Sequence, residues 1–275
     1  MKLYPLIYTN EAARSAEESL EKGVFAYLKP GTYPKVILIS GDRLLQAIDS
    51  VKKKAGSEYD SFDDSTLVWL WQQAAVPLAR KIAGRAVVGA VGYNKDSSGE
   101  DLYKVDTSAG VASFGPLAYQ LAMYAIQPSW LMSDTSLKPA SHRVWKNMYK
   151  LSEQGVYERK WLGDYNIDLI YERYFGTKRG KFTRFLSSLP PPTEDLFIKW
   201  AKENHPEEPI ENFGQFWAYR KTSHDPKIKN LFDQSEKFVE QMRTERKIPE
   251  VATREIIERS AALFFQRLYG SAASY

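Results

Sequence analysis

The chain has 275 residues, 43% of them hydrophobic and 13% aromatic, so it can bury the core of one large domain or two small ones. Its 38 lysines and arginines against 34 acidic residues leave a net charge of +4, which is too small to predict a nucleic-acid-binding surface. The absence of cysteine excludes disulfides, thiolate nucleophiles and cysteine-ligated zinc.

The sequence carries no sign of export or membrane insertion. Its first residues lack an apolar stretch followed by a small-residue cleavage site, and no run of about eighteen apolar residues occurs anywhere. We therefore expect a soluble, cytoplasmic protein with no membrane partner.

Strands and helices alternate in the first part of the chain. A helix is expected at Glu11–Lys22, an extended segment at Val24–Leu28 and a buried strand at Lys35–Ser40, where "KVILIS" is rich in β-branched residues. A helix over Ser65–Ile82 follows the capping sequence "FDDST". The segments "RAVVGAVGYNK" and "DLYKVDTSAGVA", joined by the turn-rich "DSSGE", predict a β-hairpin.

After the hairpin, a Gly-Pro turn at Phe114-Gly115-Pro116 leads into a helix over Pro116–Ile126. A strand at "SWLMSD", a helix over Pro139–Leu151 and an extended "GVYERKW" come next. Beyond Trp161 the pattern is mostly helical. The sequence thus predicts a mixed α/β sheet of about six or seven strands, flanked by helices, in residues 1–160, and a mostly helical region in residues 161–275.

The Gly-Pro turn is the first candidate binding site. Proline is tolerated at the first helical position, which makes Gly115 the expected N-cap. The start of a helix offers unpaired N–H groups and a partial positive charge, which suit a phosphate group. The candidate cradle consists of Ser113, Phe114, Gly115, Leu117 and Ala118. The alternative is an ordinary helix start with no ligand.

The first 160 residues resemble the GCN5-related N-acetyltransferase superfamily. In that fold a long hairpin leads into a central strand that splays from its neighbour, and the next helix points its N-terminus into the gap. The segments "AVVGAVGY", "LYKVDTSAGVA", "SFGPLAYQLAMYAI", "SWLMSD" and "PASHRVWKNMY" follow the order that the family requires. The local sequence is also similar to acetyltransferase-like proteins of bacteriophages, which implies a virion as an alternative location.

The resemblance implies that the loop before the helix binds the pyrophosphate of acetyl-coenzyme A. The family signature there is a basic or amide residue followed by two glycines, spaced as R/Q-x-x-G-x-G/A. Here residues 109–113 are small and not basic, only Gly115 matches, and Pro116 lacks a backbone donor. The match to the cofactor signature is therefore partial.

The resemblance also assigns catalytic roles. Backbone amides of residues 108–111 would stabilise the oxyanion, but Trp145 stands where the family places the tyrosine that protonates the thiolate. Tyr149, four residues on, is the nearest phenol, unless it is only a packing residue. Asp106 on the central strand and Asp134 at the end of the following strand are candidate bases, although Asp134 could equally cap a turn.

The remaining signals are weaker. His142, His205 and His224 are too scattered to predict a metal site. The basic, phenylalanine-containing segment Gly176–Phe185 is more typical of a solvated loop than of a nucleic-acid-binding patch. Aromatic residues at helical spacing in the last third of the chain indicate core packing, or else exposure to a protein partner.

Two functions remain open from the sequence. The chain could be an N-acetyltransferase that moves an acetyl group from coenzyme A to an amine acceptor. Alternatively, it keeps the fold without the chemistry and is a structural or interaction protein of a bacteriophage particle. In either case we expect Gly115 to be required, because a cap between a strand and Pro116 needs close backbone approach.

Overall fold

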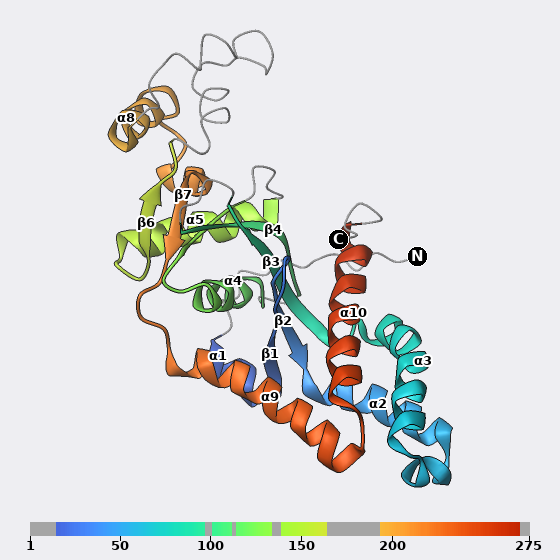
Figure 1. The fold of residues 1–275 in the computed structure, drawn as a ribbon. Coiled ribbons are helices and arrows are strands. Elements are labelled where there is room, and N and C mark those ends of the chain that lie inside the picture. The colour runs from blue at the N-terminus through green and yellow to red at the C-terminus, as the bar shows by residue number, and fades with distance from the viewer. Residues whose placement is uncertain (1–14, 97–100, 112–113, 134–138, 164–192, 270–275) are drawn as a thin grey trace. The chain divides into compact units, whose positions relative to one another are not determined.

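The computed structural model describes residues 15–96, 101–111, 114–133, 139–163 and 193–269. It shows a mixed α/β fold with a seven-stranded sheet in the order β1-β2-β3-β4-β5-β7-β6 (Figure 1). Strands β4 and β5 are parallel, whereas β1–β2, β2–β3, β5–β7 and β6–β7 are antiparallel pairs. The strands are β1 Val24–Lys29, β2 Lys35–Ser40, β3 Val87–Lys95, β4 Leu102–Gly110, β5 Trp130–Met132, β6 Glu158–Trp161 and β7 Trp217–Arg220. The predicted mixed sheet is therefore confirmed.

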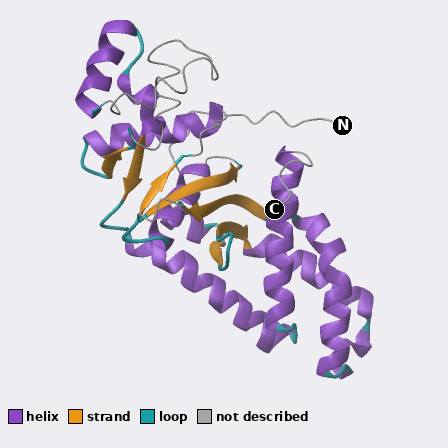
Figure 2. Ribbon diagram, turned by 45° about the horizontal axis from the view of Figure 1, so that its top comes forward, coloured by secondary structure: helices purple, strands orange, loops and turns teal. Residues whose placement is uncertain are grey.

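Helices accompany the strands along the whole described chain, as the colouring of Figure 2 shows. The α-helices are α1 Ala16–Glu21, α2 Gly41–Ala55, α3 Asp64–Ile82, α4 Phe114–Ala125, α5 Pro139–Glu153, α8 Glu194–Asn204, α9 Pro226–Arg246 and α10 Glu250–Tyr269, with short 3₁₀ helices η1 Ser57–Ser61 and η2 Ile210–Phe216. None of the described helices is long and apolar enough to cross a membrane.

The chain forms two compact units that do not follow the expected division near residue 160. The first unit comprises Met1–Asn94, Thr107–Ala125 and His224–Tyr275, and the second comprises Lys95–Asp106 and Ile126–Ser223. The last two helices, α9 and α10, therefore belong to the same unit as the N-terminal strands. The C-terminal part also contributes a strand, β7, to the sheet.

The core of the first unit joins the N-terminal elements to the last helices. Helix α3 begins at an Asp63 cap, whose carboxylate accepts a hydrogen bond from the Thr66 amide, and it packs against α2 and α10. The indole of Trp71, fully buried on α3, donates to the Tyr59 hydroxyl at 2.8 Å. That hydroxyl lies 3.1 Å from the carbonyl oxygen of Arg246, at the end of α9. One buried polar chain thus links elements that are 187 residues apart in the sequence.

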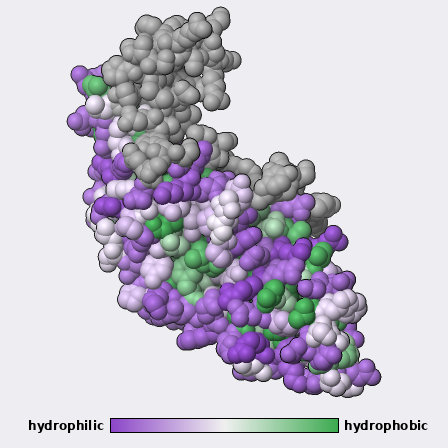
Figure 3. All heavy atoms as spheres, viewed as in Figure 1, coloured by the Kyte–Doolittle hydropathy of each residue, from purple (hydrophilic) through white to green (hydrophobic). Residues whose placement is uncertain are grey.

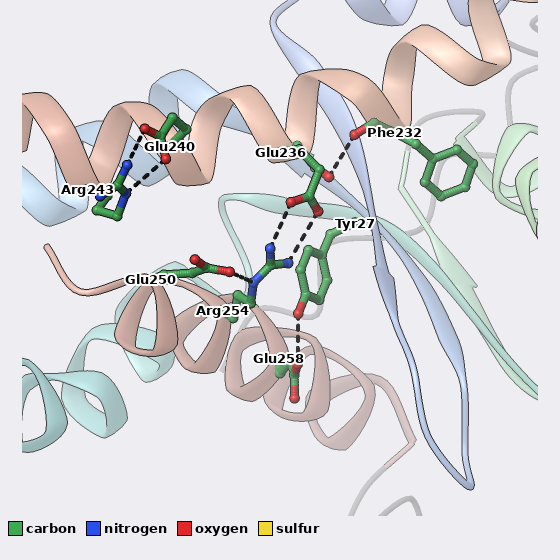
Figure 4. A network of polar contacts seen from close by, with 9 residues as sticks. Tyr27, Phe232, Glu236, Glu240, Arg243, Glu250, Arg254 and Glu258 are labelled. Atoms are coloured by element: carbon green, nitrogen blue, oxygen red, sulfur yellow. Dashed lines mark hydrogen bonds and ion pairs between the residues drawn. The ribbon is translucent and has the colours of Figure 1, made fainter.

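A polar network joins strand β1 to helices α9 and α10 (Figure 4). Arg254 makes a bidentate contact with Glu236, at 2.7 and 3.3 Å, and also bonds Glu250 at 2.9 Å. The buried Tyr27 donates its hydroxyl hydrogen to Glu258 at 2.9 Å. Burial raises the pKa of Tyr27 to about 12, and the hydrogen bond to Glu258 adds to this effect.

The raised pKa makes the first unit sensitive to alkali. The folded Tyr27 ionises at a higher pH than an unfolded tyrosine. The contribution of its neutral hydroxyl to the free energy of unfolding is therefore fully present below about pH 10 and is lost as the pH rises toward 12. Between pH 10 and 12 the free energy of unfolding of the wild type should therefore fall by roughly 1 kcal/mol more than that of Tyr27→Phe. The difference is no larger because solvent screens part of the effect of burial on the Tyr27 hydroxyl. Urea unfolding of both proteins between pH 9 and 12 measures this difference, and parallel curves would refute it.

The second unit is organised around an aromatic core. Trp217 on β7 packs against Tyr149, Trp161 and Phe197, with ring centroids 4.7, 5.1 and 6.0 Å away. The Trp217 indole donates to Glu194 at 2.9 Å, which anchors the first turn of α8 to the sheet. The described aromatics of the last third of the chain are mostly buried, as the packing interpretation predicts.

Candidate functional site

Helix α4, which carries the candidate phosphate cradle, begins at Phe114. Gly115 and Pro116 therefore lie inside the first turn, and the expectation that Gly115 is the N-cap is wrong. Ser113, the first candidate cofactor residue, lies outside the described residues.

Side chains hold α4 against strand β4 within the first unit. The Tyr119 hydroxyl donates to Oγ of Ser108 on β4 at 2.7 Å. Of the cradle candidates, Phe114, Leu117 and Ala118 are buried and belong to the core. The apolar residues whose spacing predicts this helix are therefore the residues that pack into the core.

The close backbone approach lies at Gly110 and not at Gly115. A Cβ atom added to Gly110, the last residue of β4, would lie 2.7 Å from the Gly115 nitrogen and 2.9 Å from its Cα. A Cβ atom added to Gly115 would meet nothing within 4 Å. The expected steric requirement for Gly115 is therefore wrong, and the glycine that lets strand and helix meet is Gly110.

The chain itself uses several of the backbone donors that a pyrophosphate would need. The Val111 amide donates to the Val88 carbonyl of β3 at 2.9 Å, and the Phe114 amide donates to the Val111 carbonyl at 3.1 Å. Pro116 has no N–H. The Ala118 amide is placed by helix geometry to bond the Phe114 carbonyl. At most two donors of the first turn, Gly115 and Leu117, are left for a ligand, and Gly110 packs directly against the first of these.

Strand β4 extends past its parallel neighbour. The pairing runs from Leu102 opposite Trp130 to Lys104 opposite Met132, where β5 ends, while β4 continues to Gly110. The amides expected to form the oxyanion hole lie on or next to this extension, but the last of them, Val111, is already bonded to β3.

Tyr149, the candidate acid, is a buried residue of the second unit's aromatic core. Only 4% of it is exposed, and its ring packs on Trp217 and beneath the guanidinium of Arg159, 4.7 Å away. Burial raises the pKa of Tyr149, while the positive charge of Arg159 opposes this effect. These contacts are those of a packing residue, and a raised pKa makes the phenol a weaker acid. The indole of Trp145 on the same helix is fully buried.

Of the two candidate bases, the structure describes only Asp106. Asp106 lies on β4, the strand on which it was expected, and its side chain is exposed there. Asp134 lies outside the described residues. No cluster of three or more metal-ligating side chains occurs among the residues that the structure describes.

The second unit has a surface cavity of about 320 Å³ lined by Gln127, Pro128, Arg220, Lys221 and Thr222. The guanidinium of Arg220, which lines this cavity, already has two partners within the chain. It pairs with Glu158 at 2.6 Å and lies over the Trp130 ring at 4.3 Å. The Gln127 amide donates to the Lys221 carbonyl at 2.8 Å. These contacts explain the local structure and leave few groups to select a ligand.

Comparison of the chain with models of protein families, with curated proteins and with solved structures found no match.

Proposed function

We propose that this chain is a non-catalytic protein that works through its surface, as an interaction or structural component, and that it does not transfer acetyl groups. The observation that carries the proposal is the small number of backbone amides left for a ligand at the start of α4. The Phe114 amide is bonded to Val111, Pro116 has no donor, and Gly110 packs on the Gly115 nitrogen. The described residues at this helix start do not fit the pyrophosphate of coenzyme A, which needs several outward-facing amides together.

The position of Tyr149 supports the same conclusion. A general acid must come within hydrogen-bond distance of the group that it protonates. Tyr149 instead lies between Trp217 and Arg159 in a buried aromatic cluster. A role in protein stability accounts for all of its observed contacts.

The second candidate is the acetyl-coenzyme A-dependent N-acetyltransferase that the sequence resembles. One observation favours it: β4 runs beyond its parallel pairing with β5, and a helix follows it directly, as in the family. Under this candidate, the Gly115 and Leu117 amides would hold a phosphate. The acceptor would be an amine.

Thermal unfolding with coenzyme A and with acetyl-coenzyme A separates the two functions. A ligand with a dissociation constant of about 10 µM would stabilise the folded protein by about 2.7 kcal/mol at 1 mM. We expect no change in melting temperature at 1 mM of either compound. A rise of several degrees that is reduced in Gly115→Val would support the acetyltransferase, because that side chain points into open space and would block the phosphate without disturbing the core.

A further inference from the structure

Five basic residues meet at the end of helix α3 and form what we call the basic corner. Arg80 and Lys81 lie in the last turn of α3 and Arg85 follows it, while Arg43 comes from the start of α2 and Arg267 from the last turn of α10. All five are exposed, and all belong to the first unit. Helix α3 packs against both α2 and α10, so segments far apart in the sequence bring their cations together (Figure 1).

Hydrogen bonds to the main chain hold two cations of the basic corner in place. The guanidinium of Arg43 donates to the Arg85 carbonyl at 2.6 Å, and that of Arg267 donates to the Arg80 carbonyl. Basic side chains commonly bond the last carbonyls of a helix in this way. The two guanidinium groups are thus fixed at carbonyls that are only five residues apart in the chain.

No carboxylate neutralises the basic corner among the residues that the structure describes. Lys81 donates to Oγ of Ser50 on α2 at 3.2 Å, and the other four cations form no ion pair with the described part of the chain. The segment from Ser65 to Lys95, which contains three of the five, has no acidic residue at all. The positive charges are therefore balanced only by solvent and by main-chain carbonyls.

The acidic residue next to the basic corner in the sequence, Asp42, lies on another side of the sheet. Its carboxylate is beside Gly23, 3.5 Å from the position of an added Cβ atom. Gly23 precedes β1, whereas Arg43 bonds Arg85, which precedes β3. Strand β2 lies between β1 and β3, so the side chains of Asp42 and Arg43 extend toward opposite sides of β2.

The needs of the helix end do not account for so much positive charge. The last carbonyls of α3 carry only about half of a negative elementary charge, against five positive side chains. Exposed cations of α9 and α10, by contrast, pair with acids, as in Lys229–Asp233 and Arg259–Glu255. The net charge of +4 conceals this difference, because charges elsewhere cancel in pairs. The basic corner is a local excess of positive charge that suits a polyanion.

The surface of α3 beside the basic corner is uncharged. Helix α3 has no acidic or basic residue from Ser65 to Ala79, and Trp69 is 61% exposed there. Apolar side chains reach an otherwise hydrophilic surface over α3 and α10 in Figure 3. No acidic side chain of this stretch would therefore repel an anion that extends from the basic corner along α3.

We propose that the basic corner binds the phosphate backbone of a nucleic acid without reading its sequence. Four of its five cations are arginines, and a planar guanidinium can form two parallel hydrogen bonds to one phosphate. Contacts to the backbone carry affinity but no sequence information. The proposal goes beyond the proposed function, because it names a partner for the surface of the protein, and it does not depend on whether the start of α4 binds coenzyme A.

Charge density favours a nucleic acid over an acidic peptide. The chain from Arg80 to Arg85 covers about 7.5 Å at the rise of a helix. A DNA duplex carries about four negative charges over that length, which approaches the five positive charges of the basic corner. An extended peptide made only of acidic residues carries about two over the same length.

Fluorescence anisotropy of a labelled DNA duplex of about 20 base pairs, titrated with the full chain, tests the proposal. Each neutralised phosphate contributes about −0.9 to the slope of the logarithm of the association constant against the logarithm of salt concentration, so five contacts predict about −4.5. This slope corresponds to a roughly 500-fold loss of affinity between about 25 and 100 mM salt. The triple variant Arg80→Gln, Lys81→Gln, Arg85→Gln should reduce the slope to about −2 and weaken binding at least tenfold at the lower salt concentration.

Lys237→Gln is the matched control. Lys237 is an exposed lysine of α9 in the same unit, and its replacement changes the net charge as Lys81→Gln does. It should leave the slope unchanged and the affinity within about twofold of wild type. The single variant Arg85→Gln, at an exposed residue outside the helix, should lower the magnitude of the slope by about one, and it keeps the test valid if the triple variant unfolds.

Three results would overturn the proposal. The first is no binding of wild-type protein to the duplex at about 25 mM salt. The second is a slope that Arg85→Gln leaves unchanged while circular dichroism shows an intact fold. The third is binding to polyglutamate, or to vesicles of anionic lipid, that is as tight as binding to the duplex, because the partner would then be an acidic protein or a membrane.

Discussion

Gly214→Ala should destabilise the protein by about 3 kcal/mol or more. Gly214 lies in η2 where that helix contacts α5, and an added Cβ would come 2.7 Å from the Trp145 carbonyl carbon and 3.0 Å from the Lys146 nitrogen. These are backbone atoms of a regular helix, so neither can move aside cheaply. The Gly214 carbonyl also accepts a bond from the buried Tyr219 hydroxyl at 2.8 Å, which a shift of η2 would disturb.

Chemical denaturation followed by near-ultraviolet circular dichroism measures the effect, because the second unit contains the aromatic cluster. Asn212→Ala in the same 3₁₀ helix is the matched control and should change stability by less than about 0.5 kcal/mol. Equal stability of Gly214→Ala and wild type would show that η2 and α5 are not in this close contact.

The second large effect is expected at the end of β4. Gly110→Ala should destabilise the protein by about 2 kcal/mol, because its Cβ would overlap the backbone of Gly115. The melting temperature should fall by roughly 4–8 °C.

Gly115→Ala is the control for this prediction. Gly115 is helical and its Cβ position is open, so alanine should be neutral or stabilise the protein by up to about 1 kcal/mol. The opposite ranking, with Gly115→Ala the more harmful, would restore Gly115 as the required glycine and contradict the packing of β4 on α4.

Local sequence patterns predict most of the elements in the first half of the fold. The β-branched run of β2, the Asp63 cap of α3 and the apolar spacing of α4 all indicate their structures correctly. Sequence analysis missed helix α2 and strand β7. In β7, residues 217–219 are buried in succession among aromatics at helical spacing, so they show no alternation to indicate a strand.

The candidate site was harder to predict than the fold. A Gly-Pro turn before a helix indicates backbone amides that a ligand could bind. The sequence does not reveal that a carbonyl of the chain itself already accepts one of them, as the Val111 carbonyl does from the Phe114 amide. Likewise, the pattern cannot tell which of two glycines is crowded, because that depends on how β4 approaches α4. The sequence places Trp69 on a helix, and its exposure emerges only when α2 and α10 cover the opposite face.

Amide NMR spectra of the full chain, recorded during a titration with coenzyme A to about 2 mM, test most directly whether the start of α4 holds a cofactor. Because the Phe114 amide is already bonded and the two remaining amides are too few for a pyrophosphate, the signals of Phe114, Gly115 and Leu117 should not move beyond the small changes seen with an equal concentration of inorganic phosphate. Saturable shifts of these three amides with coenzyme A, absent in Gly115→Val, would contradict the non-catalytic proposal and establish a cofactor site.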